Sequence, residues 1–373
     1  MQSPLRQYVA ALCAAALPVF AFAADEGRVL VGQTVALTGG LGEHGRGVTA
    51  GAKLYLDSVN ASGGVGGRRI TLVTLDDGGD AKRAAENTRL LIERDGVVTM
   101  FGGIEGGPCV ASLKEATAHG VPVIGCMAGS PEMRDPFNRY SFPVRAPHFE
   151  EFAKLLDVAK TFGFHRVAFV HSDSDTGRKH LANVQKLAAA RALEVAPIVL
   201  NSDASPQALA DAVGTANVEA VFNHGSYATY SAVIRAAHAK GIRPMFMAVN
   251  SGAAQMAREL GTDARGLIFT QVVPFPWTIS VPVVKDYQQA LARYALGTEP
   301  SFSGLEGYIS AKVLVAGLRA TGRDVSRDRL QRQMESLGAV DVGGMTVHYA
   351  PGTHSGSTFV DSVIVARDGH FAR

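Results

Sequence analysis

Short runs of apolar residues alternate with longer amphipathic segments along nearly the whole chain. Strands that are apolar on both faces are typical of parallel sheets covered by helices, so each run predicts a buried β-strand. The predicted strands are Val29–Leu37, Ile70–Leu75, Val97–Phe101, Val121–Gly125, Val167–His171, Val195–Leu200, Ala220–Asn223, Met245–Ala248 and Leu267–Gln271.

The segments between these runs carry the signatures of helices. Apolar residues recur on one helical face from Val48 to Val59. Asp80 is placed to cap a second helix, and Pro108 suits the first position of a third helix that ends at Gly120. Strands that alternate with helices predict an α/β fold.

Three proline-containing breaks interrupt the alternation, as expected for two lobes that exchange the chain three times. The breaks are Phe142–Phe152, Val272–Pro282 and His348–Ser357, with crossovers expected near Arg145, Pro274 and Tyr349. The predicted first lobe combines residues 24–145 and 277–348, and the second combines residues 146–276 and 349–373.

Residues 1–23 have the pattern of a secretory signal peptide. A single charge, Arg6, precedes an apolar run that ends in Ala21-Phe22-Ala23, a small-residue cleavage site. The alternative is a membrane anchor, but the run is short and contains Pro18. We expect an exported, periplasmic protein without direct membrane insertion.

The formal net charge of +2 gives no electrostatic reason to expect nucleic acid or an anionic membrane as partner. After cleavage only Cys109 and Cys126 remain, too few for a disulfide scaffold. Both follow predicted strands on the same side of the sheet, but sequence gives no Cα separation, so a disulfide between them stays open.

Gly40-x-Gly42-x-x-Gly45 has the glycine spacing of a dinucleotide-binding turn. However, Asp76 lies 31 residues after Gly45, whereas the acidic residue of a dinucleotide site follows at about 20. His44 also inserts a large side chain where the loop should be small. We therefore expect no nicotinamide cofactor.

The stretches "LTGGLGEHGRGVTAGAKLYLD", "NASGGVGGR", "DDGGDAKRA", "VPVIGCMAGSPEMRD" and "FPVRAPHFEEF" occur in this order. Together they resemble the type I periplasmic solute-binding proteins, in particular the branched-chain amino-acid (Leu/Ile/Val) binding family. The resemblance implies a two-lobed clamshell with three hinge crossovers, which closes over a small solute and presents it to the permease of an ABC importer. It further implies a monomer with no catalytic activity and no cofactor.

In this family the loops at the strand ends bind the solute. Position by position, the resemblance implies as ligand-binding residues His44, Glu105, Gly106, Gly107, Met127, Ala128, Gly129, Ser130, Thr176, Ser226, Tyr227, Asn250 and Gln271, with Gly42, Glu43 and Asp175 in the same loops. The helix N-terminus at Gly106 and Gly107 favours a ligand carboxylate, whereas Glu105 beside it favours a cation.

The pattern departs from that of α-amino-acid binders, which place hydroxyl residues in the third- and fourth-strand loops and a carboxylate after the strand matching Met245–Ala248. This chain has Gly106, Gly129 and Asn250 there. The expected solute is therefore a small polar organic molecule, amino-acid-like, an amide or a carboxylate, and leucine, isoleucine and valine are not expected to bind tightly.

Other chemistry is not indicated. Asp76, Asp77 and Asp80 lack a calcium-loop pattern, the histidines lack zinc spacing, and no G-x-S-x-G elbow supplies a nucleophile. Two roles remain open, a transport receptor and a ligand-sensing module of the same fold that signals to a protein partner.

Overall fold

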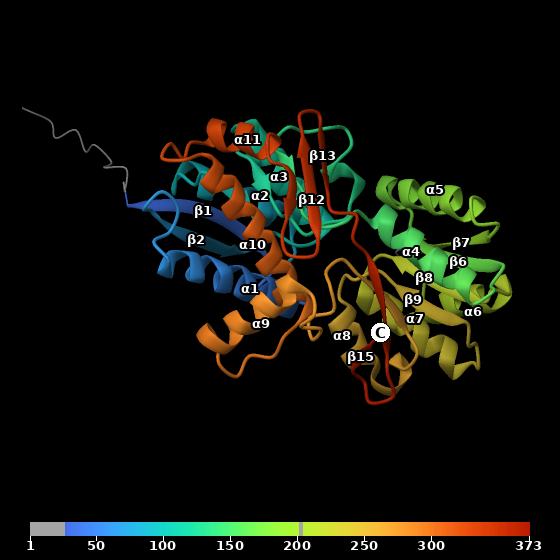
Figure 1. Ribbon diagram of the computed structural model, residues 1–373. Coiled ribbons are helices and arrows are strands. Elements are labelled where there is room, and N and C mark those ends of the chain that lie inside the picture. Colours follow the sequence, from blue (N-terminus) through green and yellow to red (C-terminus); the bar gives the residue numbers. More distant parts are fainter. Residues whose placement is uncertain (1–26, 201–203) are drawn as a thin grey trace, which may run out of the picture.

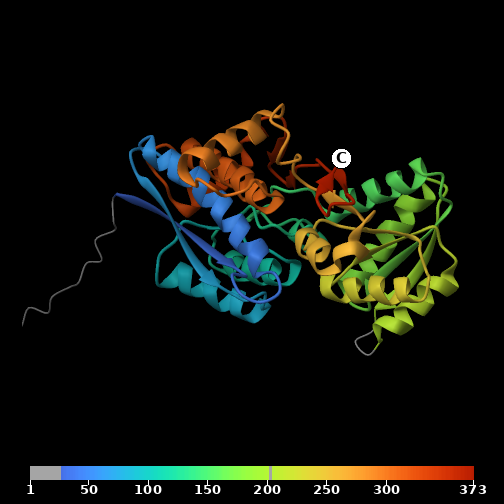
Figure 2. The same cartoon turned by 90° about the horizontal axis from the view of Figure 1, so that it is seen from below.

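The computed structural model describes residues 27–200 and 204–373, so the predicted signal peptide lies outside the described residues. The chain forms two lobes joined by three crossovers, as Figures 1 and 2 show from two directions. Each lobe is built on a sheet whose strands are mainly parallel, with helices on both faces. The predicted α/β class is confirmed.

The sheet of the first lobe has the order β2-β1-β3-β4-β5, and all its neighbouring strands pair in parallel. The strands are β1 (Arg28–Val35), β2 (Arg69–Asp76), β3 (Thr99–Phe101), β4 (Val123–Ile124) and β5 (Ser141–Phe142). Three helices connect them: α1 (Gly42–Ala61), α2 (Ala81–Glu93) and α3 (Gly106–Ala118). Asp80 caps α2 by accepting a hydrogen bond from the Arg83 amide, as predicted.

Later parts of the chain complete this lobe with α9 (Pro282–Tyr294), α10 (Phe302–Ala320) and α11 (Arg327–Glu335). Glycines let α10 lie directly against α1. A Cβ on Gly51 would stand 1.8 Å from the Gly304 carbonyl oxygen, and one on Gly307 would stand 2.0 Å from that of Val48. Any side chain at these two positions would separate the helices.

The sheet of the second lobe has the order β15-β14-β10-β9-β8-β6-β7. Its parallel strands are β6 (Arg166–Ser172), β7 (Glu194–Leu200), β8 (Ala220–His224), β9 (Met245–Ala248) and β10 (Ile268–Gln271); β14 (Asp361–Val365) and β15 (Phe371–Ala372) add to one edge as antiparallel strands. Helices α4 (His148–Thr161), α5 (Asp175–Ala189), α6 (Pro206–Ala216), α7 (Tyr227–Ala239) and α8 (Ala253–Leu260) flank it. Apolar clusters pack on both faces.

A small antiparallel sheet of β11 (Gly338–Asp341), β12 (Thr346–Ala350) and β13 (Thr353–Gly356) corrects one expected boundary. The Tyr349 hydroxyl donates to the Pro143 carbonyl at 2.9 Å, and His354 contacts the Ser141 carbonyl at 2.7 Å. These bonds hold residues 349–356 against the end of the first sheet. The third crossover therefore lies between Gly356 and Asp361, not near Tyr349, because β12 and β13 pair with each other before the chain leaves.

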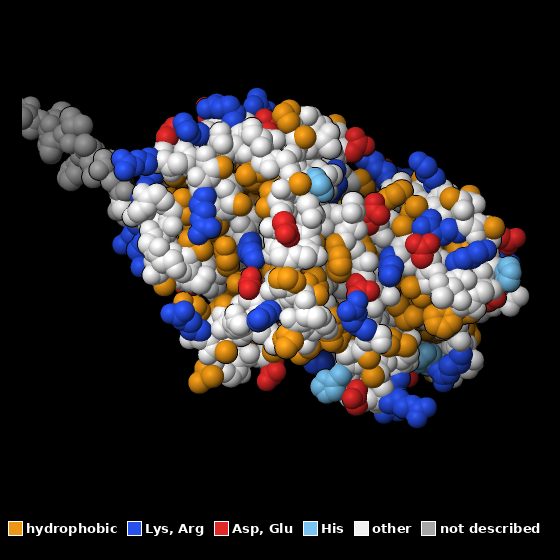
Figure 3. All heavy atoms as spheres, viewed as in Figure 1, with side chains coloured by type: hydrophobic (Ala, Val, Ile, Leu, Met, Phe, Trp, Pro, Cys, Tyr) orange, Lys and Arg blue, Asp and Glu red, His pale blue; other side chains and the backbone are white. Residues whose placement is uncertain are grey.

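All nine predicted strands are present, some of them shorter than expected. β5, β11 to β15 and the two short 3-10 helices at Pro131–Met133 and Gly261–Ala264 were not predicted. On the face seen in Figure 3, positive and negative side chains are interspersed over both lobes.

Candidate functional site

The carboxyl ends of the strands of both sheets face the space between the lobes. In parallel α/β sheets, ligands bind at these strand ends. Two cavities lie there, one of about 520 Å³ and one of about 1000 Å³. Residues 249 and 251 line the first cavity and Asn250 lines the second, so the loop between β9 and α8 borders both.

The smaller cavity, here called the α3 cavity, collects most of the residues that the sequence singled out. It is lined by the predicted Glu105, Gly106, Gly107, Met127, Ala128, Gly129, Ser130, Thr176 and Ser226. The first seven come from the first lobe and the last two from the second, so the cavity is shared between the lobes. The loops after β3 and β4 lie side by side because Ile104 and Met127 form a parallel bridge.

The N-terminus of α3 opens into this cavity. The amides of Gly106 and Gly107 have no intrahelical acceptor, and the Glu105 side chain makes no capping hydrogen bond to them. Glu105 has a φ of 69°, a left-handed backbone conformation that is strained for a residue with a side chain. A Cβ on Gly106 would stand 2.4 Å from the Ser130 hydroxyl oxygen, so glycine keeps this approach open. The arrangement can hold a hydrogen-bond acceptor such as a carboxylate.

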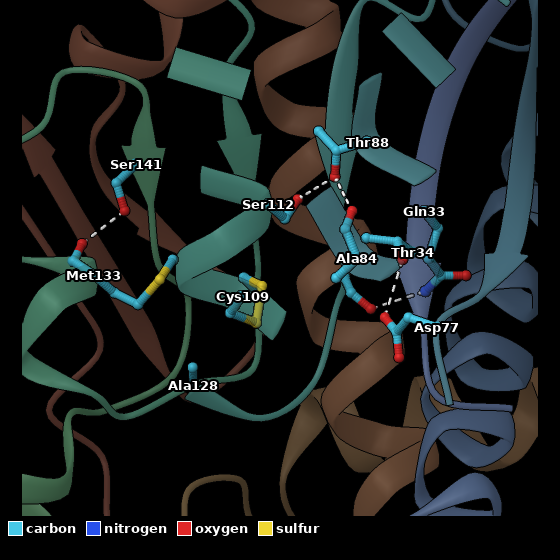
Figure 4. Close-up of a disulfide and its surroundings, with 12 residues drawn as sticks. Gln33, Thr34, Asp77, Ala84, Thr88, Cys109, Ser112, Ala128, Met133 and Ser141 are labelled. Atoms are coloured by element: carbon cyan, nitrogen blue, oxygen red, sulfur yellow. Dashed lines mark hydrogen bonds between the residues drawn. A yellow bond between two sulfur atoms is a disulfide. The ribbon is translucent and has the colours of Figure 1, made fainter. Parts of the chain in front are cut away.

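A disulfide fixes two walls of the α3 cavity. Cys109 in the first turn of α3 is bonded to Cys126 after β4, with 6.0 Å between their Cα atoms. Figure 4 shows it beside Ser112 and Thr88, whose hydroxyls are hydrogen-bonded at 2.8 Å. The question that the sequence left open is answered, and the bond ties the N-terminus of α3 to the neighbouring loop.

Burial raises the pKa of the Glu105 carboxyl, although the charge of Arg145 partly opposes this rise. Glu105 is thus a carboxyl that a hydrogen-bond donor or a cation on the solute would stabilise. Glu132, which also lines the cavity, is already engaged: it accepts a hydrogen bond from Thr176 at 2.8 Å and lies 3.8 Å from Lys179.

Two histidines contribute to the second-lobe wall of the α3 cavity, and the sequence analysis did not predict them. His148 and His224 line the cavity, and the buried His180 packs on His224 with 4.0 Å between ring centroids. Burial lowers the pKa of all three, that of His180 to about 3. They are neutral at pH 7. Their positions in the sequence, on α4, α5 and the end of β8, gave no spacing signal for this cluster.

Below the cleft lies a buried ion pair between Arg145, in the first crossover, and Glu151 of α4. The Glu151 carboxylate also contacts the His148 ring. It accepts hydrogen bonds from the backbone amide of Asn250 at 3.0 Å and from the Thr270 hydroxyl at 2.6 Å. Burial alone would raise the pKa of Glu151, but the charge of Arg145 and the hydrogen bonds outweigh it and hold the pKa at about 2.

The larger cavity, here called the crossover cavity, contains the predicted residues His44, Asn250 and Gln271. It is also lined by aromatic residues that the sequence analysis did not select: Phe275, Trp277, Phe302 and Phe371. Burial and the charge of Arg145 lower the pKa of His44 to about 4, so its ring is neutral at pH 7.

Tyr227 lines neither cavity and instead connects the lobes. Its hydroxyl donates to the Gly40 carbonyl at 2.9 Å. Arg258 of the second lobe forms an ion pair with Glu43 of the first at the rim of the crossover cavity. Together with the contact between Thr176 and Glu132, these bonds hold the lobes against each other on both sides of the cleft.

Within residues 27–200 and 204–373, no group of three or more His, Cys, Asp or Glu side chains is arranged to hold a metal ion. No helix in the same part of the chain is long and apolar enough to cross a membrane.

Comparison with known proteins identifies the family. A family profile described as periplasmic binding protein matches residues 28–366. The chain belongs to the periplasmic binding protein family. Among curated relatives, Leu/Ile/Val-binding protein homolog 3 of Brucella melitensis is 25% identical over 302 residues, 79% of each chain. An amino acid binding protein of Pseudomonas aeruginosa is 22% identical over 79% of each chain.

Solved structures of periplasmic binding proteins show the same fold. An extracellular ligand-binding receptor from Verminephrobacter eiseniae has a TM-score of 0.84 and 24% identity, covering 93% of this chain and all of that one. A fatty acid ABC transporter substrate-binding protein from Thermomonospora curvata has a TM-score of 0.80 and 17% identity, covering 92% of this chain and 90% of that one. The predicted family and two-lobed fold are confirmed, and this periplasmic binding protein is a solute-binding protein of a non-enzymatic family.

Proposed function

We propose that this periplasmic binding protein is exported by its N-terminal signal peptide and captures a small polar organic solute between its lobes for an ABC permease. The observation that supports this most is the α3 cavity. Both lobes line it, and it presents a helix N-terminus next to the partly buried carboxyl of Glu105.

The chemistry of the α3 cavity favours a solute with both an acceptor and a donor. A carboxylate or amide oxygen suits the free amides of Gly106 and Gly107. A hydrogen-bond donor or cationic group of the solute suits Glu105, whose charged form is destabilised by burial. The relatives are named as binders of amino acids, which are small polar organic solutes. Asn250 and the other positions that differ from amino-acid binders lead us to propose a wider class of amides and carboxylates.

The same geometry supports the proposed delivery to a permease. The contacts between the lobes, from Tyr227 to Gly40 and from Thr176 to Glu132, involve side chains at the cleft edge. A solute bound to both lobes adds contacts that only the closed form can make, so it shifts the population toward closure. The closed receptor, which we propose acts as a monomer, then differs in shape from the empty one, and a permease can distinguish the two.

Small-angle scattering of the mature protein, stripped of bound solute and then saturated with solute, tests this function. The solute is identified by mass spectrometry of what mild denaturation releases from periplasmically expressed protein. We expect a smaller radius of gyration with solute, because the lobes rotate about the three crossovers. An unchanged scattering profile at saturation would contradict capture by closure.

A further inference from the structure

The crossover cavity contains an aromatic cluster, defined here as Phe275, Trp277, Phe302 and Phe371. The centroids of Phe275 and Trp277 are 4.9 Å apart, those of Trp277 and Phe302 5.7 Å, and those of Phe302 and Phe371 5.7 Å. The residues come from three segments: the second crossover, the first turn of α10, and the C-terminal β15. The fold therefore assembles the cluster where the two lobes meet.

Core packing accounts for only part of this cluster: Phe275, Phe302 and Phe371 pack against the core of the second lobe, but each also lines the cavity. Trp277 is 43% exposed, and Phe275, Phe302 and Phe371 are only partly buried. Phe302 packs against the cores of both lobes, but its ring also lines the cavity. Aromatic rings that border a cavity of about 1000 Å³ between two lobes leave apolar surface for a ligand to cover.

Two neutral amide side chains border the same cavity, and one of them has an unpartnered oxygen. Asn250 is 7% exposed, and its Oδ1 atom has no hydrogen-bond partner among the described residues. Gln271 is 2% exposed and also borders the cavity. Because buried polar groups are almost always hydrogen-bonded, an unpartnered amide oxygen beside a cavity points to a ligand donor. Neither amide carries a charge, so the ligand group they meet can be uncharged.

We propose that the captured solute carries a planar aromatic group, and that this group occupies the crossover cavity against Trp277 and Phe302 while Asn250 hydrogen-bonds one of its polar substituents. The proposal rests on the proposed receptor function and specifies the class of solute. Ring stacking supplies the selection: offset or edge-to-face contacts at centroid distances of 4.5 to 7 Å favour a planar ring over a saturated ring of equal size.

Two matched pairs of probes test the planar group with the polar head held constant: benzamide against cyclohexanecarboxamide, and benzoate against cyclohexanecarboxylate. Trp277 is the only tryptophan of the chain, so its fluorescence reports directly on the cavity. We expect the planar member of at least one pair to bind at least about threefold more tightly by calorimetry, the lower part of the range that aromatic contacts supply, and to change the Trp277 emission. Equal or tighter binding of the saturated members, an unchanged emission, or no binding of any probe would overturn the proposal.

The variant Phe302→Leu removes one ring of the cluster, and Phe162→Leu is its matched control. Phe162 is 55% exposed on the second lobe and stacks on Phe164, outside both cavities. Phe302→Leu should weaken binding of the planar probe about twofold to tenfold and reduce its preference over the saturated probe. Phe162→Leu should change neither. A melting curve for each variant separates lost binding from lost folding, and an unchanged preference in folded Phe302→Leu would refute the assignment.

The outcome for the receptor function is separate. If scattering shows closure on a natural solute that has no aromatic ring, the assignment of the crossover cavity fails and the receptor function stands. If no solute closes the lobes, the receptor function itself fails.

Discussion

Replacing Glu151 by glutamine should destabilise the protein by about 3 kcal/mol at pH 7. Glu151 is fully buried, and Arg145, His148, Thr270 and the Asn250 amide all contact its carboxylate. These contacts lower its pKa from 4.5 to about 2. At 1.36 kcal/mol per tenfold change in the acid constant, the shift corresponds to about 3 kcal/mol. Removing one partner of a buried ion pair typically costs about 3–5 kcal/mol, which agrees.

The pH dependence of this cost has a definite sign. The native pKa of Glu151 lies below the unfolded value, so its contribution is complete above about pH 4.5 and is lost as the pH falls toward 2. Glutamine cannot titrate. The difference in unfolding free energy between wild type and Glu151→Gln should therefore shrink as the solution is acidified, to about half its neutral value near pH 3.

Urea unfolding at pH 7 and at pH 3, followed by circular dichroism, measures this difference. Glu150→Gln is the matched control, because Glu150 belongs to the same turn of α4 but is partly exposed and forms no ion pair within the described chain. The control should change stability by less than about 0.5 kcal/mol. The reasoning is refuted if Glu151→Gln costs no more than the control, or if its cost does not change between the two pH values.

Three further predictions concern the cleft. Reducing the Cys109–Cys126 disulfide should lower the free energy of unfolding by about 3 kcal/mol, because the bond closes a loop with a sequence separation of 17. Urea unfolding with and without reductant measures this difference. Two free thiols in denatured, unreduced mature protein would exclude the bond. Tyr227→Phe removes the hydrogen bond to the Gly40 carbonyl and should weaken binding of the solute identified by mass spectrometry about twofold to tenfold, as measured by calorimetry. Unchanged affinity would mean that this bond does not favour closure. Leucine should bind this protein at least about a hundredfold more weakly than it binds a receptor with a carboxylate at position 250. A micromolar or tighter dissociation constant for leucine by calorimetry would contradict this. If Glu105→Gln then abolished the binding of leucine, Glu105 would be the group that supplies the missing charge.

The sequence predicted the strands and the loop positions well because both follow from periodicity. Buried parallel strands are apolar on both faces, so their runs stand out. The antiparallel β11 to β13 were missed because they are short and half exposed, as in the alternating burial of Thr346–Ala350. The same hairpin keeps Tyr349 with the first lobe through its bond to Pro143, which moved the third crossover.

The sequence indicated which loops lie at the candidate site, but it did not indicate how the cleft between the lobes is divided. Strand order decides which loops are neighbours, and therefore the set after β3 and β4 could be grouped from sequence. The division of the cleft into two cavities could not be predicted, because the loop that borders both cavities is held at Asn250 by a contact with Glu151, which is distant in sequence. The histidine wall was missed for a similar reason: His148 and His224 are distant in sequence, and only the packing of α4 on β8 brings their rings to 4.6 Å.

The contacts under the cleft are buried and strong, whereas an ion pair between the lobes at the rim of the cleft is exposed and weak. Under the cleft, the buried Glu151 pairs with Arg145 and accepts a hydrogen bond from the backbone amide of Asn250. These bonds fix the loop that borders both cavities to the second lobe. Removing one partner of the buried ion pair would destabilise the fold by several kcal/mol. At the rim, the ion pair of Arg258 with Glu43 is more than half exposed, and such pairs typically contribute no more than about 1 kcal/mol. We expect opening of the lobes to break such exposed rim contacts and to leave the buried ion pair intact. If closure follows the proposed mechanism, a solute that touches both lobes shifts the balance between open and closed forms, and substitutions at the rim should change the affinity for solute without unfolding either lobe.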